Sequence, residues 1–185
     1  FGNPIEFPMT PQHPCRPVNV YSASKLSQES LAFAYHQSWG LKIIITRSFA
    51  YWNPRRKDLF ATAFAMQVAR IEQGKQKILH HGNLNSIRQI MNVKDMVRAY
   101  WLASEKCGFC DPYNIGGQDI LSVGEYLEIL KSYAAVNIVC EEKKSLLRPK
   151  DVDKQLCDTS KFDELTGFQP KYTMEESIKW LLDCC

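Results

Sequence analysis

The sequence predicts an α/β fold in which helices cover a mainly parallel sheet. Three observations lead there: the length suits one ordinary domain or a piece of a larger one, apolar residues recur at helical spacing, and short β-branched runs lie between those segments. The 185 residues are 45% hydrophobic and 23% charged, which is enough apolar material for a packed core. Strands that alternate with helices are typical of a parallel sheet.

The first elements follow an opening stretch that holds five of the nine prolines. Proline excludes a helix there, so we expect a surface loop. Residues 22–39 then show helical spacing and end at Gly40. The apolar run 41–47 is typical of a short, fully buried strand. A second helix over 58–73 and a short strand near Ile78 are expected next.

Helix-capping signals mark the later elements. Ser122 with Glu125, and Thr173 with Glu176, form capping boxes that predict helix starts. The remaining expectations are a helix over 92–106 with Asn92 as its N-cap, a strand over 111–115, a helix from 122 to about 133, a strand over 137–140 and an amphipathic C-terminal helix. Tyr100 and Trp101 fall within the third helix and are expected to pack in the core.

Charge and composition exclude several classes of function. Lys and Arg exceed Asp and Glu by three, 23 against 20, and these charges are spread along the chain. A nucleic-acid-binding protein more often has a basic stripe, so we expect no nucleic-acid partner. No apolar run approaches the roughly 20 residues of a membrane helix, and no signal peptide opens the sequence. We therefore expect a cytoplasmic protein with no membrane partner.

The seven cysteines are odd in number and irregular in spacing. Cys107 and Cys110 form one C-x-x-C pair, which is either redox-active, half of a zinc site, or a pair of reduced thiols in a turn. No second pair follows, so we favour reduced thiols and expect no metal site.

Tyr21-Ser-Ala-Ser-Lys25 is the sharpest chemical feature. Residues four apart share one helix face, so the Lys25 ammonium is expected beside the Tyr21 phenol. A nearby cation favours the phenolate, which makes a tyrosine usable as a proton acceptor. The competing interpretation is a solvated lysine beside a half-buried tyrosine.

A series of motifs in fixed order gives this pair its context. The chain resembles the extended short-chain dehydrogenase/reductase family, most closely GDP-mannose 4,6-dehydratase and its reductase relatives. The motifs that carry the resemblance are the proline-rich loop, Tyr21-x-x-x-Lys25, Thr46-Arg-Ser-Phe49, Pro54-Arg-Arg56, Gly82-Asn-Leu84 with Arg88, Asp95-Met-Val-Arg-Ala-Tyr-Trp101, Tyr113-Asn-Ile-Gly116 and Leu147-Arg-Pro-Lys-Asp151.

The resemblance implies the C-terminal part of a Rossmann-type NAD(P)-binding fold, a parallel sheet with helices on both faces, plus a small mixed α/β substrate-binding lobe. Residues 1–75 would form the Rossmann part. Residues 76–185 would form mainly the lobe, with returning Rossmann elements. The nine glycines include no G-x-G-x-x-G, so we expect the dinucleotide loop and a catalytic Thr and Glu to precede Phe1.

The resemblance also implies roles for individual residues. Tyr21 would be the catalytic base, and Lys25 would hold the nicotinamide ribose of NADP or NAD. Tyr51 and Arg56 would contact the cofactor. The pyrophosphate of a nucleotide sugar would meet two arginines, whose guanidinium groups suit phosphate oxygens. The substrate-binding set implied in this way is Asn83, Arg88, Arg148 and Asp151.

The activity implied is that of a nucleotide-sugar dehydratase, a lyase that converts GDP-mannose to its 4-keto-6-deoxy form and recycles NADP. We expect the parent protein to be a homodimer or homotetramer and this chain alone to be inactive. The alternatives are a GDP-4-keto-6-deoxy-mannose reductase, a UDP-sugar 4-epimerase, or a non-catalytic nucleotide-sugar-binding remnant.

Three positions depart from the family pattern. Relatives carry Asn where Ala50 stands, Gly where Asn53 stands and Asp where Gln89 stands. Loss of one buried hydrogen-bond partner costs on the order of 1–3 kcal/mol, so weaker substrate binding is expected.

Overall fold

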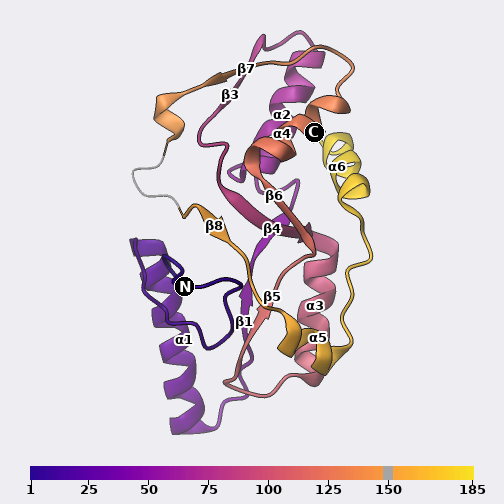
Figure 1. Cartoon of the computed structure of the whole chain (residues 1–185). Coiled ribbons are helices and arrows are strands. Elements are labelled where there is room, and N and C mark those ends of the chain that lie inside the picture. Colours follow the sequence, from indigo (N-terminus) through magenta and orange to yellow (C-terminus); the bar gives the residue numbers. More distant parts are fainter. Residues whose placement is uncertain (148–151) are drawn as a thin grey trace.

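The chain folds into helices and short strands (Figure 1). These elements pack around two clusters of buried apolar side chains. The computed structural model describes residues 1–147 and 152–185. Its helices are α1 (Val20–Trp39), α2 (Phe60–Glu72), α3 (Val93–Lys106), α4 (Val123–Ser132), α5 (Ser160–Thr166) and α6 (Met174–Asp183), with one 3₁₀ turn, η1 (Lys144–Leu146). Its strands are β1 (Ile45–Ser48), β2 (Ala50–Trp52), β3 (Ile78–His81), β4 (Ile87–Asn92), β5 (Pro112–Ile115), β6 (Asp119–Ser122), β7 (Val139–Glu142) and β8 (Lys154–Gln155).

The strands are mainly parallel, as predicted, but they form three small sheets. β1 pairs with β5, β3 pairs with β7, and β2, β4 and β6 form the third sheet with β8 beside β4. All these pairings are parallel except that of β4 with β6. Only Phe49 separates β1 from β2, so one extended segment passes from the first sheet to the second. This connection places the two sheets end to end in Figure 1.

β4 joins the two hydrophobic cores. Ile90 belongs to the larger core and its neighbour Met91 to the smaller one, because successive side chains of a strand point to opposite faces. The larger core lies among α2, α4 and α6 and is centred on Trp52, Phe64, Tyr126, Leu127, Leu130, Ile178 and Leu181. The smaller core lies among α3, α5 and β5 and is centred on Met96, Ala99, Tyr113, Ile115, Phe162 and Phe168.

α1 begins and ends where the sequence predicts. Asn19 and Ser22 form a reciprocal capping box at its start, and Gly40 adopts the left-handed conformation, with φ of 66°, at its end. Unlike the other α-helices, it buries none of its side chains. Among the described residues, α1 is therefore a helix held to the body by few contacts.

Several predictions about burial are wrong. Only Ile45 is buried in β1, because among the described residues this strand has a neighbour, β5, on one side only. α3 also turns one face outward: Tyr100 is 41% and Trp101 67% exposed, so neither is a core residue. The proline-rich opening is a loop, as predicted, but Met9 and His13 within it are buried.

The sequence also gave no signal for four short strands, β2, β4, β6 and β8. In the described ranges, no helix has the length and apolar character needed to cross a membrane.

The capping box of α6 provides a first prediction. Thr173 Oγ1 accepts a hydrogen bond from Glu176 N, and the Glu176 carboxylate accepts one from Thr173 N at 2.8 Å. This backbone hydrogen bond holds the pKa of Glu176 below its ordinary value. Thr173→Ala is expected to lower the free energy of unfolding by about 1 kcal/mol, measured by urea denaturation. Thr173→Ser keeps the hydroxyl and is the control; an equal loss in both variants would contradict the capping explanation.

Candidate functional site

Tyr21 and Lys25 lie together in the first two turns of α1, as their spacing predicts. The Lys25 ammonium lies 5.7 Å from the centroid of the Tyr21 ring and donates a hydrogen bond to Gln28 at 3.2 Å. Tyr21 is 71% exposed. The phenol is thus open to a ligand and has a cation close by, which is the arrangement that a proton-accepting tyrosine needs.

Arg56 lies in the loop between β2 and α2. Asn53 shapes the loop, because its side-chain oxygen accepts from Arg55 N at 3.0 Å and its carbonyl accepts from Arg56 N at 3.0 Å. The Arg56 guanidinium donates twice to the Asp58 carboxylate, at 2.8 and 2.9 Å. These bonds, and the negative charge of Asp58, raise the pKa of Arg56 above its ordinary value.

The Tyr51 and Tyr21 phenols also interact electrostatically with the Arg56 guanidinium. Tyr21, Tyr51 and Arg56, which are expected at a cofactor site, come from α1, β2 and the following loop. Asn53, which departs from the family pattern, has a clear structural role as the residue that holds this loop.

Asn83 and Arg88 lie on another part of the molecule, around the start of β4. Asn83 donates to Ser86 Oγ at 3.0 Å and accepts from Asn85 N at 2.9 Å, so its amide shapes its own turn. Arg88 is half-buried in β4 and donates to the Ile87 carbonyl at 2.9 Å. Arg148 and Asp151, the other two residues expected to bind substrate, lie outside the described residues.

The two remaining departures have local explanations. Gln89 is 7% exposed; it donates to the Gly117 carbonyl at 2.6 Å and accepts from Cys157 N at 2.7 Å. A carboxylate can only accept, so an aspartate would not make both bonds. Gln89 thus stabilises the fold. Ala50 packs at the edge of the larger core, where its methyl group forms no hydrogen bond.

All seven cysteines are free. Cys107 is buried, and Cys110 has a φ of 55° in the turn that follows α3. Burial raises the pKa of the Cys157 thiol well above its ordinary value, so this thiol stays protonated near neutral pH. Across the described ranges, no group of three or more His, Cys, Asp or Glu side chains is arranged to hold a metal ion.

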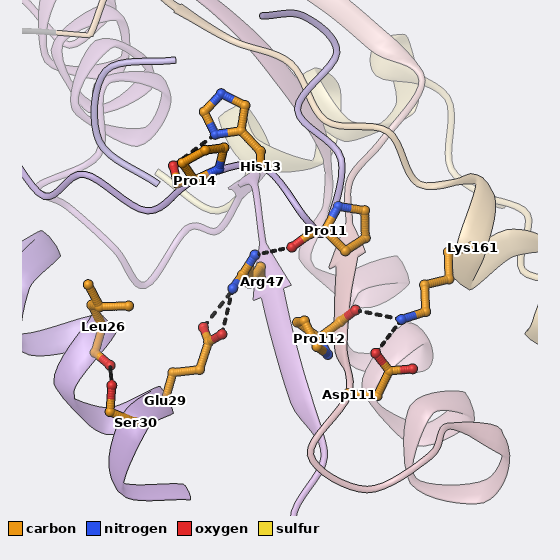
Figure 2. Close-up of polar contacts among 10 residues, drawn as sticks. All are labelled: Pro11, His13, Pro14, Leu26, Glu29, Ser30, Arg47, Asp111, Pro112 and Lys161. Carbon is orange, nitrogen blue, oxygen red and sulfur yellow. Dashed lines mark hydrogen bonds and ion pairs between the residues drawn. The ribbon is translucent and has the colours of Figure 1, made fainter. Parts of the chain in front are cut away.

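Sequence reasoning missed an ion pair between α1 and β1. Arg47 of β1 contacts Glu29 of α1, with Nη2 and Oε1 2.5 Å apart (Figure 2). Glu29 follows Lys25 by four residues, as Lys25 follows Tyr21. This continued spacing was the available signal, but the partner on β1 was not predictable from it.

The fold and the Tyr–Lys pair define a member of the extended short-chain dehydrogenase/reductase class. The model of the GDP-mannose 4,6 dehydratase family matches residues 1–181, and the chain belongs to that family.

Three comparisons show how much of a relative the chain represents. It is 30% identical to GDP-mannose 4,6 dehydratase 1 of Arabidopsis thaliana, over 99% of this chain and 51% of that protein. It is 28% identical to the GDP-6-deoxy-D-mannose reductase of Pseudomonas aeruginosa, over 90% of this chain and 55% of that protein. The solved structure of RMD from Pseudomonas aeruginosa complexed with NADPH covers 96% of this chain with a TM-score of 0.89 at 23% identity, and the match spans 60% of that chain. The chain thus spans about half the length of these curated relatives.

Proposed function

We propose that the 185 residues are one half of a nucleotide-sugar dehydratase that binds NADP or NAD and acts on GDP-mannose. The observation that carries this proposal is the Tyr21–Lys25 pair on one exposed face of α1, where the ammonium lies 5.7 Å from the centroid of the phenol ring. Tyrosine near a lysine is suited to proton transfer with a sugar hydroxyl, and the family to which the chain belongs carries out such chemistry.

The residues present fit the nicotinamide end of a dinucleotide but not its phosphate end. The exposed Tyr21 phenol and Lys25 ammonium offer hydrogen bonds to a ribose, whereas the sequence contains no glycine-rich phosphate loop. When bound, the cofactor would accept a hydride from carbon 4 of the sugar and later return it to carbon 6. Tyr21, as a phenolate, would take the proton of the hydroxyl on carbon 4 through its phenolic oxygen and become a neutral phenol. Lys25 would favour the phenolate before this transfer and hold the ribose.

On the substrate side, we propose that Arg88 binds the pyrophosphate and that Asn83 lines the nucleotide pocket, together with Arg148 and Asp151. A guanidinium on a strand is well suited to this role, because the strand fixes its direction and its planar N–H groups match phosphate oxygens. Residues 1–75 would then contribute the cofactor contacts, and residues 76–185 would contribute mainly the substrate contacts.

Two features support the view that a second half completes the site. β1 has an unpaired edge among the described residues, and α1 buries no side chain, so both offer surface to further structure. The curated relatives are about twice as long as this chain. We propose that the completing half carries the phosphate loop and that the isolated chain has no turnover.

A reductase is the second candidate, supported by the 28% identity to the Pseudomonas reductase. A UDP-sugar 4-epimerase is a third candidate within the enzyme class. Ala50 favours instead a non-catalytic remnant that binds nucleotide sugar, since a methyl group cannot replace an amide in substrate binding.

Calorimetry with the purified chain tests the binding half of the proposal. We expect GDP-mannose to bind, and Arg88→Gln to weaken binding by about tenfold or more, because a charge-assisted hydrogen bond contributes ~1.5–3 kcal/mol. Arg70→Gln, which removes an exposed guanidinium from α2, is the matched control and should bind as the unsubstituted chain does. Absence of binding, or equal loss in both variants, would argue against a pyrophosphate site at Arg88.

The claim that the chain is a half has a separate test. The coding sequence directly upstream of Phe1 is expected to continue in frame, with a glycine-rich loop and a Thr with a nearby Glu. A stop codon there would favour the remnant. Turnover of GDP-mannose by the isolated chain, followed as formation of the keto sugar, would refute the proposed inactivity.

A further inference from the structure

Arg47 connects three parts of the molecule that are distant in sequence (Figure 2). Its Nε and Nη2 atoms donate to the two oxygens of Glu29 on α1, at 3.1 and 2.5 Å. Its Nη1 donates to the Pro11 carbonyl at 2.6 Å, in the opening loop. The guanidinium also lies 4.7 Å from the centroid of the Phe1 ring. One side chain of β1 thus holds both the loop and the helix.

The bond to Glu29 has the geometry of a strong, directional ion pair. Two parallel N–H···O bonds fix the orientation of both groups, as a single contact between point charges would not. The Arg47 and Glu29 side chains are only 16% and 15% exposed, so water screens them weakly. Because α1 has no buried side chain, this pair is a main determinant of where the helix lies.

The pair also fixes the rotation of α1 about its axis. Tyr21, Lys25 and Glu29 are spaced four apart and lie along one face of the helix. When Glu29 is held against Arg47, the rotation of α1 is fixed, and Tyr21 two turns nearer the N-terminus is left 71% exposed beside the body of the protein. The Tyr21 phenol there interacts electrostatically with the Arg56 guanidinium.

We infer that Arg47 and Glu29 form a positioning pair, which fixes the place and rotation of α1 and so sets the direction in which Tyr21 and Lys25 point. The inference rests on the proposed function, because aiming is useful only if Tyr21 and Lys25 act in the reaction. Neither residue of the pair touches substrate or cofactor; both act through α1. The Pro11 contact extends the effect to the loop that leads into the Asn19 cap of the same helix.

The experiment uses the full chain labelled with 3-fluorotyrosine and contains no ligand. The ¹⁹F signal of Tyr21 is assigned by its loss in Tyr21→Phe. In the unsubstituted chain, Arg56→Gln is expected to shift this signal, because the guanidinium lies within electrostatic reach of the phenol. Glu29→Gln removes the ion pair between α1 and Arg47. When Arg56→Gln is added to this variant, the shift that it causes in the Tyr21 signal should be at most half of that in the unsubstituted chain.

Three further variants separate positioning from general damage. Arg47→Lys keeps the charge but loses the paired donors, and should give an intermediate response. The charge-reversed double variant, Glu29→Arg with Arg47→Glu, should restore part of the response. Glu128→Gln breaks an exposed ion pair to Lys131 on α4 and should leave the response unchanged.

Two results would overturn the inference: a response in Glu29→Gln equal to that of the unsubstituted chain, or no response to Arg56→Gln in the unsubstituted chain. If the proposed function fails instead, calorimetry would show no binding of GDP-mannose, while the ¹⁹F response to Arg56→Gln would be unchanged.

Discussion

Replacing Gly117 with alanine is expected to lower the free energy of unfolding by about 3 kcal/mol or more. A Cβ atom at this position would lie 2.0 Å from the carbonyl oxygen of Ile90 and 2.8 Å from the Cβ of Met91. Both neighbours belong to β4, the strand that joins the two cores, so relief of the clash requires a backbone shift in the centre of the fold. The Gly117 carbonyl would move with it and weaken its hydrogen bond from Gln89.

Urea denaturation measures this effect, and Gly108→Ala provides the matched control. A Cβ at Gly108 would meet only the Tyr113 hydroxyl, at 3.5 Å, which is ordinary van der Waals contact. We expect the control to change stability by less than about 1 kcal/mol. Equal midpoints for Gly117→Ala and the unsubstituted chain would contradict the close approach of this turn to β4.

Local sequence signals predicted the helices well. The capping residues Asn92, Ser122 and Thr173 each accept a backbone hydrogen bond where the sequence predicts a helix start. These signals succeed because a cap and its partner lie within one turn of each other. Their geometry therefore depends little on the rest of the fold.

The strands were harder to predict, because their neighbours decide their burial. β4 contains the polar residues Arg88, Gln89 and Asn92, which interrupt the apolar pattern of a strand whose last four positions are buried. Gln89 is buried because Gly117 and Cys157 satisfy both ends of its amide, and both partners are distant in sequence. Conversely, the apolar run that contains β1 predicted a fully buried strand, whereas its burial depends on a neighbour that the described residues do not contain.

The candidate site also contains residues that the sequence revealed and residues that only the structure revealed. Tyr21 and Lys25 were found by their spacing on one helix. Spacing on one helix could not reveal the contacts that hold this helix in place. Arg47 follows its partner Glu29 by 18 residues and lies on a different element, β1. Spacing therefore located the Tyr21–Lys25 pair, whereas the structure was needed to find the ion pair that holds the helix carrying it.

Asp95→Asn is expected to lower the free energy of unfolding by about 3 kcal/mol, because a fully buried carboxylate loses the charge that holds a half-buried guanidinium and two backbone N–H groups. Asp95 is fully buried in the first turn of α3. Its carboxylate contacts the Arg98 guanidinium at 2.8 Å and accepts hydrogen bonds from Lys171 N and Tyr172 N at 3.0 Å. An asparagine would turn an N–H₂ group toward one set of these donors and leave it unsatisfied.

The exposed pair of Glu175 and Lys179 is the control, since its atoms are also 2.8 Å apart while its side chains are 62% and 55% exposed. Glu175→Gln should leave the urea midpoint nearly unchanged, because water screens an exposed ion pair. A larger loss of stability in Asp95→Asn than in Glu175→Gln, at equal ion-pair distance, would then be due to burial and to the two backbone hydrogen bonds.

Those bonds tie α3 to the segment just before the Thr173 cap, so Asp95→Asn should also raise the rate of amide hydrogen exchange at Tyr172 and along α6. Equal destabilisation by both substitutions, with no change in exchange along α6, would show that Asp95 does not link these elements.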